Sequence, residues 1–187
     1  SLVDGYLSSL EETFLPEEKE FILRLGGGQP FFLQIAGHYL VDARSQGLRA
    51  RPLFEQAVAD FDLQADPHFS YLWNHCTESE KITLLGILAL NREKAKKGAT
   101  HAERLQKMNP RSHLDVVTLG KRGLVIESDS KYSLFSPSLE RWILHEIMTA
   151  PGEEETPASV EEWLHKGGRD KVEPVKGTLP KFKKKYW

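Results

Sequence analysis

The chain has 187 residues and a formal net charge of −2, with 40% hydrophobic and 28% charged residues. This size and balance are typical of one globular domain or two small ones and exclude a chain that is disordered throughout. No apolar run approaches the roughly 18–20 residues of a membrane span, so we expect no membrane contact. Cys76 is the only cysteine. That count excludes an internal disulfide and, with no signal-peptide pattern at the start, favours a cytoplasmic location.

Residues 1–65 predict four helices separated by prolines and glycines. Apolar residues recur at the 3.6-residue helical period over 2–14. The other three helices each begin at a proline. Proline lacks an amide hydrogen, and at the first position of a helix that hydrogen would have no partner within the helix. We expect them over about 16–25, 30–47 and 52–61. The middle one is apolar on most sides and should lie at the centre of the core.

Residues 66–150 predict three helices, a β-hairpin and a last helix. Thr77 and Glu80 fit a capping box ahead of the first of these helices. A polar turn at 128–130 separates two β-rich runs, and Pro137 begins the last helix. Three helices followed by a two-stranded hairpin form a winged helix-turn-helix. The fold class predicted for the chain is therefore all-α, or mainly helical, with one small hairpin.

Residues 151–187 predict a charged linker and tail. Glutamates come first, at 153–155 and 161–162, and lysines and arginines follow from Lys166 onward. Ser159 is a candidate cap for a short helix that includes Trp163. Beyond it, few apolar residues are available to offset the entropy cost of ordering the chain.

The chain carries no motif of a complete enzyme. It contains no GxxxxGK[ST] phosphate loop, no GxGxxG, no HExxH and no paired-cysteine metal motif. Its seven histidines never stand three or four residues apart, so no two share a helical face. We therefore predict no catalytic residue, no metal site and no enzymatic activity for this chain alone.

Two patterns are candidates for ligand binding. The glycine-rich turn at Gly28, Gln29 and Pro30 presents backbone N–H groups ahead of a helix, which suits either an anion or close helix packing. The second pattern is a set of side chains that would face a DNA major groove and its phosphates, formed by Arg111, His113, Thr118, Lys121, Arg122 and Lys131. Asp115 and Asp129 lie among them, which favours a protein-packing role over DNA binding.

Two stretches resemble one family. Residues 27–34, GGQPFFLQ, look like the GGxPyxLQ stretch in the helical lid of STAND ATPases, a signal-transduction class related to AAA+ proteins. The runs 123–125, 132–137 and 142–143 resemble the wing and last helix of the winged-helix domain that follows that lid. The resemblance covers about residues 5–150. It implies a four-helix-type AAA+ lid in 1–65, a winged helix in 66–150 and a linker in 151–187.

The resemblance also implies a function. In that family a GxP motif contacts the adenine region of the nucleotide, which assigns contact with ATP or ADP to Gly28, Gln29 and Pro30. The phosphate-loop lysine and the acidic residues that hold magnesium belong to an N-terminal P-loop NTPase domain, so the chain is expected to be a fragment whose partner is that domain. The phosphate-sensing histidine of the related NB-ARC branch would fall near 134–136, where Phe135 cannot donate a hydrogen bond.

The implied role is to close over the nucleotide and to pass its state through the winged helix to an effector domain or an oligomer partner. Two alternatives stay open: a winged-helix module that binds DNA, and a protein-interaction adaptor that works independently of nucleotide.

Overall fold

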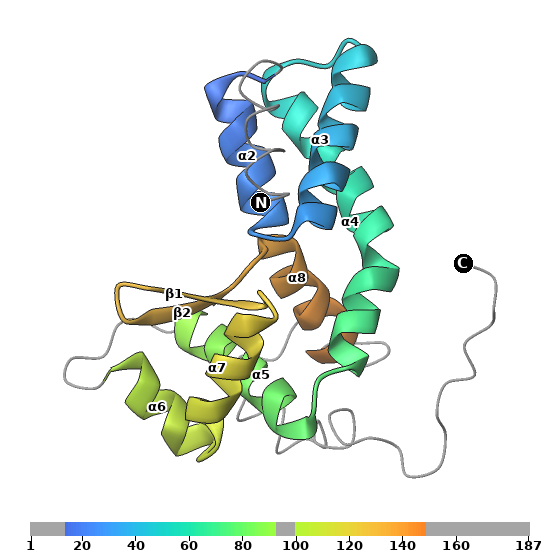
Figure 1. Cartoon of the computed structure of the whole chain (residues 1–187). Coiled ribbons are helices and arrows are strands. Elements are labelled where there is room, and N and C mark those ends of the chain that lie inside the picture. The colour runs from blue at the N-terminus through green and yellow to red at the C-terminus, as the bar shows by residue number, and fades with distance from the viewer. Residues whose placement is uncertain (1–13, 93–99, 149–187) are drawn as a thin grey trace.

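The computed structural model describes residues 14–92 and 100–148 of the chain. Helices dominate this part of the chain, and its one sheet is a two-stranded antiparallel hairpin (Figure 1). The predicted mainly helical class with a small hairpin is therefore confirmed. The helix expected over 2–14 and the short helix expected after Ser159 lie outside the described residues. The elements are α2 (Pro16–Gly26), α3 (Pro30–Ser45), α4 (Ala50–Asn74), α5 (Glu78–Arg92), α6 (His101–Met108), α7 (Ser112–Lys121), β1 (Val125–Ser128), β2 (Lys131–Leu134), α8 (Pro137–Trp142) and the π-helix η1 (Ile143–Met148).

Helix α3 lies at the centre of the N-terminal layer and packs against both α2 and α4, as its apolar sequence predicted (Figure 1). Leu33, Ala36 and Leu40 are fully buried along it. The start of α2 is tied to the end of α3 through Glu18, whose carboxylate accepts a hydrogen bond from the Leu15 amide at 2.8 Å and from Arg44 at 2.5 Å. These contacts fix the first helix pair at the end farthest from the hairpin.

Helix α4 is much longer than the sequence indicated. It was expected to end near Phe61, and a domain boundary was expected between residues 65 and 66; the structure has one continuous helix through Asn74. The reason is an unbroken buried stripe at every fourth position, formed by Ala57, Phe61, Ala65, Phe69 and Trp73. Pro67 lies on the exposed side of this helix, where water can bond to the carbonyl that a proline leaves unpaired.

The C-terminal elements follow the predicted order. The capping box at α5 is present: the Thr77 amide donates to the Glu80 carboxylate at 2.7 Å, and the Glu80 amide donates to the Thr77 hydroxyl at 3.2 Å. In the hairpin, Val125 pairs with Leu134 and Ser128 with Lys131. Asp129 and Ser130 form the turn with φ of 50° and 59°, the left-handed region that two-residue hairpin turns require.

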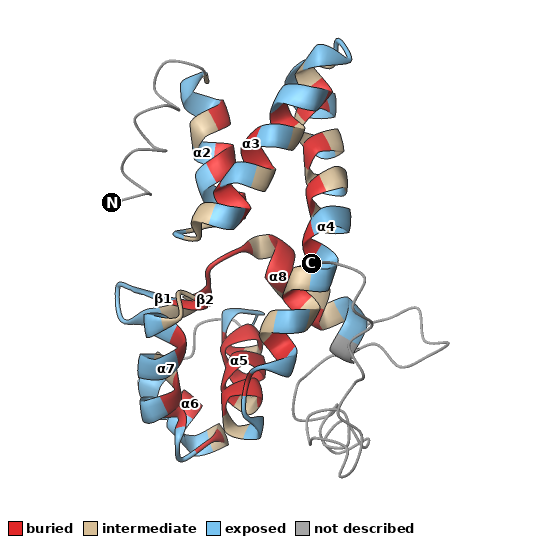
Figure 2. Cartoon of the chain, turned by 45° about the vertical axis from the view of Figure 1, so that its right-hand side comes forward, coloured by how far each residue is buried: buried red, intermediate tan, exposed pale blue. Residues whose placement is uncertain are grey.

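The N-terminal helices and the part of the chain that contains the hairpin form two layers, and these layers share one aromatic core. Phe32 of α3 stacks on Phe69 of α4 with ring centroids 5.2 Å apart, and Phe135, just after β2, lies 5.3 Å from Phe32. Helix α8 lies between the layers and is buried where it faces α4 (Figure 2). Arg141 and Trp142 at its end donate hydrogen bonds to Asp62 and Asp66 of α4. The N-terminal helices and the hairpin unit therefore pack as one body.

Replacing Gly27 is expected to destabilise this body. Gly27 has a φ of 55°, and a Cβ there would lie 2.6 Å from the Phe135 carbonyl oxygen. Gly27→Ala should lower the free energy of unfolding by at least about 1–2 kcal/mol, the cost of the left-handed conformation alone. Urea denaturation measures it.

The matched control is Gly28→Ala, because a Cβ at Gly28 meets nothing within 4 Å. Equal losses in the two variants would contradict the packing described for this turn.

Candidate functional site

The glycine-rich turn between α2 and α3 is seated against the junction of α7 and β1. Gly27 lies against the Phe135 backbone, as described above. On the other side, the Gln29 side-chain amide donates a hydrogen bond to the Arg122 carbonyl at 2.8 Å. Gly123 has a φ of 69°, and a Cβ there would lie 2.5 Å from the Gln29 amide nitrogen. The turn and the helix end are therefore held together by contacts that only glycine permits.

Gly28, Gln29 and Pro30, the residues expected to contact a nucleotide, have three different environments. Gly28 is exposed, between two anchored neighbours. Pro30 is partly buried at the first position of α3. The side-chain amide of Gln29 is directed into the protein by its bond to Arg122. The accessible surface that the turn offers to a ligand is thus the backbone of Gly28 and the ring of Pro30, and Gln29 has a packing role that the sequence did not reveal.

The stretch at 134–136, where the resemblance would place a phosphate sensor, is used for packing. Leu134 and Phe135 are buried in the core, with 5% and 3% of their surface exposed. The Ser136 hydroxyl accepts a hydrogen bond from the Ser138 amide and caps α8. None of the three directs a polar side chain to solvent.

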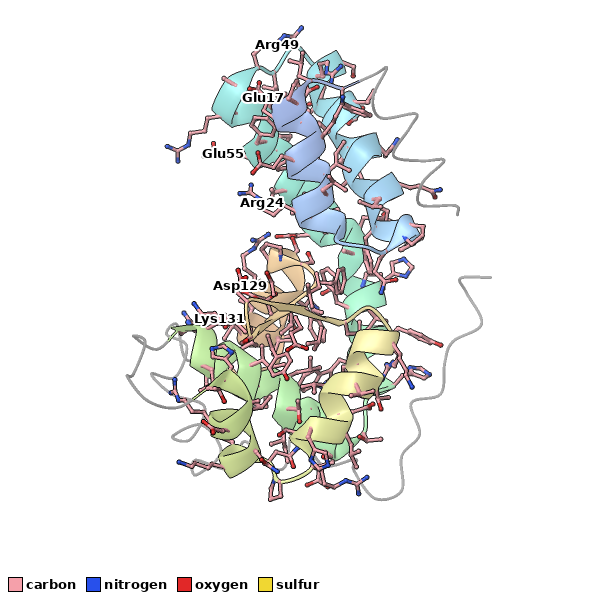
Figure 3. All side chains as sticks on the ribbon, turned by 60° about the vertical axis from the view of Figure 1, so that its left-hand side comes forward. Glu17, Arg24, Arg49, Glu55, Asp129 and Lys131 are labelled. Carbon is pink, nitrogen blue, oxygen red and sulfur yellow. The ribbon has the colours of Figure 1, made fainter. Side chains whose placement is uncertain are left out.

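The residues predicted to face DNA are only partly brought together. Arg111, His113, Thr118 and Lys121 are exposed along α7, and Lys131 is exposed beside Asp129 at the tip of the hairpin (Figure 3). Arg122, by contrast, is only partly exposed. Its guanidinium lies 3.4 Å from the Glu80 carboxylate and 3.7 Å from the Cys76 sulfur, which removes one of the expected cations from the set.

Apolar side chains occupy the middle of the same surface. Leu114 and Val117 are 53% and 54% exposed on α7, where a DNA-reading helix would carry polar groups. Beside them lies a groove of about 320 Å³ between α6, α7 and the hairpin. Its apolar wall is formed by Ala102, Leu105, Val116, Val117, Val125 and Tyr132.

A second groove, of about 710 Å³, lies between α2 and α4. Phe21 and Phe54 line it, with ring centroids 4.9 Å apart. Glu17, Arg24 and Glu55 stand around it (Figure 3). Because both signs of charge are present, this groove favours neither an anionic nor a cationic ligand.

A buried polar cluster fixes α7 on α5. The Asp115 carboxylate is 6% exposed and accepts hydrogen bonds from Ser79, Thr83 and Asn109 at 2.6, 2.8 and 2.9 Å. The Asn109 side-chain oxygen accepts from the Arg111 amide and closes the turn between α6 and α7. From its place in the sequence, Asp115 was expected among the DNA-facing positions instead. The available signal was the four-residue spacing of Ser79 and Thr83, which puts two hydroxyls on one face of a helix.

The chain's single thiol, that of Cys76, is buried. Cys76 is 7% exposed, and burial raises the pKa of its thiol. Burial also lowers the pKa of the neighbouring Lys81, whose ammonium lies 5.5 Å from the Trp73 ring centroid. The adjacent His75 is exposed, with its ring against Tyr71. A protonated thiol is a poor nucleophile and a poor metal ligand.

Comparisons with known proteins give no relative. No family model matches the chain, and neither a curated protein nor a solved structure matches it. Within residues 14–92 and 100–148, no three His, Cys, Asp or Glu side chains lie close enough to hold a metal ion. No helix in the same ranges is both long and apolar enough to cross a bilayer.

Removing the Asp115 carboxylate is expected to destabilise the α5–α7 contact. Asp115→Ala removes the carboxylate to which the fully buried Thr83 hydroxyl, the half-buried Ser79 hydroxyl and the Asn109 amide donate, which should cost about 1–3 kcal/mol in the free energy of unfolding. Thermal and urea denaturation measure the loss.

Glu127→Ala removes an exposed carboxylate from β1 and is the control, expected to change stability by less than about 0.5 kcal/mol. A loss at Asp115 as small as that at Glu127 would show that the cluster does not hold α7.

Acidification is expected to weaken the contact between α6 and the hairpin. The Tyr132 amide donates to His101 Nδ1 at 3.3 Å, which requires that nitrogen to be unprotonated. Burial, together with Arg104 and Lys131, lowers the pKa of His101. The unfolded chain therefore takes up the proton first, so stability should fall as the pH drops below about 6.5 and stay level above it.

The effect should be smaller than about 1 kcal/mol, since the ring is partly exposed and its charged neighbours are screened by solvent. Urea denaturation at about pH 7.5 and pH 5.5 measures it, on either side of the ordinary histidine pKa. His101→Gln should reduce the pH dependence, whereas His38→Gln, at an exposed histidine of α3, should leave it in place. A pH dependence unaltered by His101→Gln would refute the assignment.

Proposed function

We propose that this chain is the lid and winged-helix part of a STAND or AAA+-like ATPase, and that it responds to whether ATP or ADP is bound. In this proposal the chain is not an enzyme by itself. The nucleotide phosphates and magnesium are held by a P-loop NTPase domain that acts as its partner, and the chain supplies the contact on the adenine side and transmits the state of the site.

The observation that carries the proposal is the seating of the glycine-rich turn. Gly27 is fixed against Phe135 just after β2 and Gln29 against the end of α7, while Gly28 between them is exposed. A glycine without a Cβ lets the backbone approach a flat ring closely, and Pro30 adds a rigid apolar edge beside it. A ligand at Gly28 and Pro30 would therefore touch a turn whose neighbours already contact the winged-helix unit.

A displacement of the glycine-rich turn can reach the winged-helix unit through direct contacts. A shift of the turn moves the Phe135 backbone through Gly27 and the end of α7 through Gln29. The Phe32–Phe69–Phe135 packing passes the same shift to α4 and α8, because close-packed cores transmit displacement rather than absorb it. The exposed face of α7 is then the surface that an effector domain or an oligomer partner would read.

The test is a calorimetric titration of ATP and ADP into the full-length protein that carries this chain. Pro30→Ala should weaken nucleotide binding roughly tenfold, about 1.4 kcal/mol, because the rigid edge is lost. Pro52→Ala is the matched control, since Pro52 also lies in the first turn of a helix but is exposed on α4, away from the glycine-rich turn.

Gln29→Ala separates binding from transmission. It should leave nucleotide affinity close to that of the wild type while reducing the difference in amide exchange at α7 between the ATP-bound and ADP-bound states. Affinity that is the same in Pro30→Ala and the wild type would overturn the proposal and leave the turn with a packing role alone.

A further inference from the structure

The groove between α6, α7 and the hairpin has the features of a docking site. Its wall is apolar, and its volume of about 320 Å³ is at the low end of ligand pockets, which span about 300–1,000 Å³. Val117 lines it and Leu114 stands on the same helix, each more than half exposed. An exposed apolar pair beside an apolar groove is typical of a surface that another segment covers.

The elements that form the groove carry exposed lysines. Lys107 lies on α6, Lys121 on α7 and Lys131 on β2, and the exposed Glu103 of α6 is close enough to Lys107 to feel its charge. Lys131 lies close enough to His101 of α6 to help lower the pKa of that imidazole. Glu127 is the one acidic residue among those that line the groove. The partner that fits is an acidic segment with apolar anchors.

The chain contains such a segment in residues 151–165. This stretch has five glutamates and no lysine or arginine. Within it, Val160, Trp163 and Leu164 stand at the i, i+3, i+4 spacing that puts three apolar side chains on one face of a helix. Trp is the residue that most often anchors an interface in a pocket.

We propose that residues 151–165 dock in this groove, with Trp163 and Leu164 against its apolar wall and the glutamates toward Lys107, Lys121 and Lys131. The chain between Met148 and Val160 can span roughly 40 Å when extended. That reach is ample for a body whose expected radius of gyration is about 14 Å. The docked segment covers Val117 and Leu114, so it blocks any other partner of the outer face of α7. This inference does not depend on nucleotide binding.

The experiment uses the whole chain with a spin label in its acidic segment. Cys76→Ala removes the native thiol, and Ala158→Cys supplies the labelling site next to the apolar anchors. Docking should cause a strong loss of amide NMR signal at Leu105, Val117 and Tyr132, which lie on α6, α7 and β2. Trp163→Ala together with Leu164→Ala should restore these signals, whereas Trp187→Ala, at the other tail tryptophan, should not.

Two further variants test the groove itself. Val117→Glu puts a like charge into an exposed position, so it should release the segment without unfolding the protein. Lys131→Glu should weaken docking, and Glu161→Lys with Glu162→Lys should restore it.

Three outcomes would overturn the proposal. The first is signal at the groove that is equal with and without the label. The second is loss confined to another surface. The third is loss seen only when labelled and isotope-enriched copies are mixed, which would mean that a second copy occupies the groove.

Discussion

The close approach of the Gly27 backbone to the Phe135 carbonyl is the constraint on which the arrangement of the two layers depends. A side chain at this position would collide with that carbonyl, and its φ of 55° is unfavourable for any residue but glycine. Because the turn lies flush with the strand end, α3 starts at a fixed place above the hairpin. Phe32, in the first turn of α3, then reaches both Phe69 and Phe135.

Helix α4 extends this single contact into a shared core. Its buried stripe runs the full length of the helix. The first half of α4 packs against α2 and α3, and the second half packs against α8. A protein built this way cannot rotate α5, α6, α7 and the hairpin freely against its N-terminal helices without breaking aromatic packing. For the proposed function, this means that a nucleotide signal would move both units together relative to the domain that holds the phosphates.

Helix α7 has two faces with different tasks. Its inner face is held by the buried Asp115 carboxylate and by Leu119, which is fully buried. Hydrogen bonds from Ser79, Thr83 and Asn109 hold that carboxylate, so α7 keeps one orientation on α5. The outer face carries Leu114 and Val117, which are more than half exposed and available to a partner.

The sequence by itself determined most local structure. Prolines and the Thr77–Glu80 capping box marked helix starts, and the polar turn marked the hairpin, because these signals act within a few residues. It did not determine where α4 ends, since a buried stripe outweighs the helix-breaking tendency of Pro67 once there is a core to pack against. Only the tertiary structure decided the roles of Gln29, Arg122 and Asp115. Their partners lie 93, 42 and 36 residues away in the chain, and no local pattern encodes which distant group a polar side chain will meet.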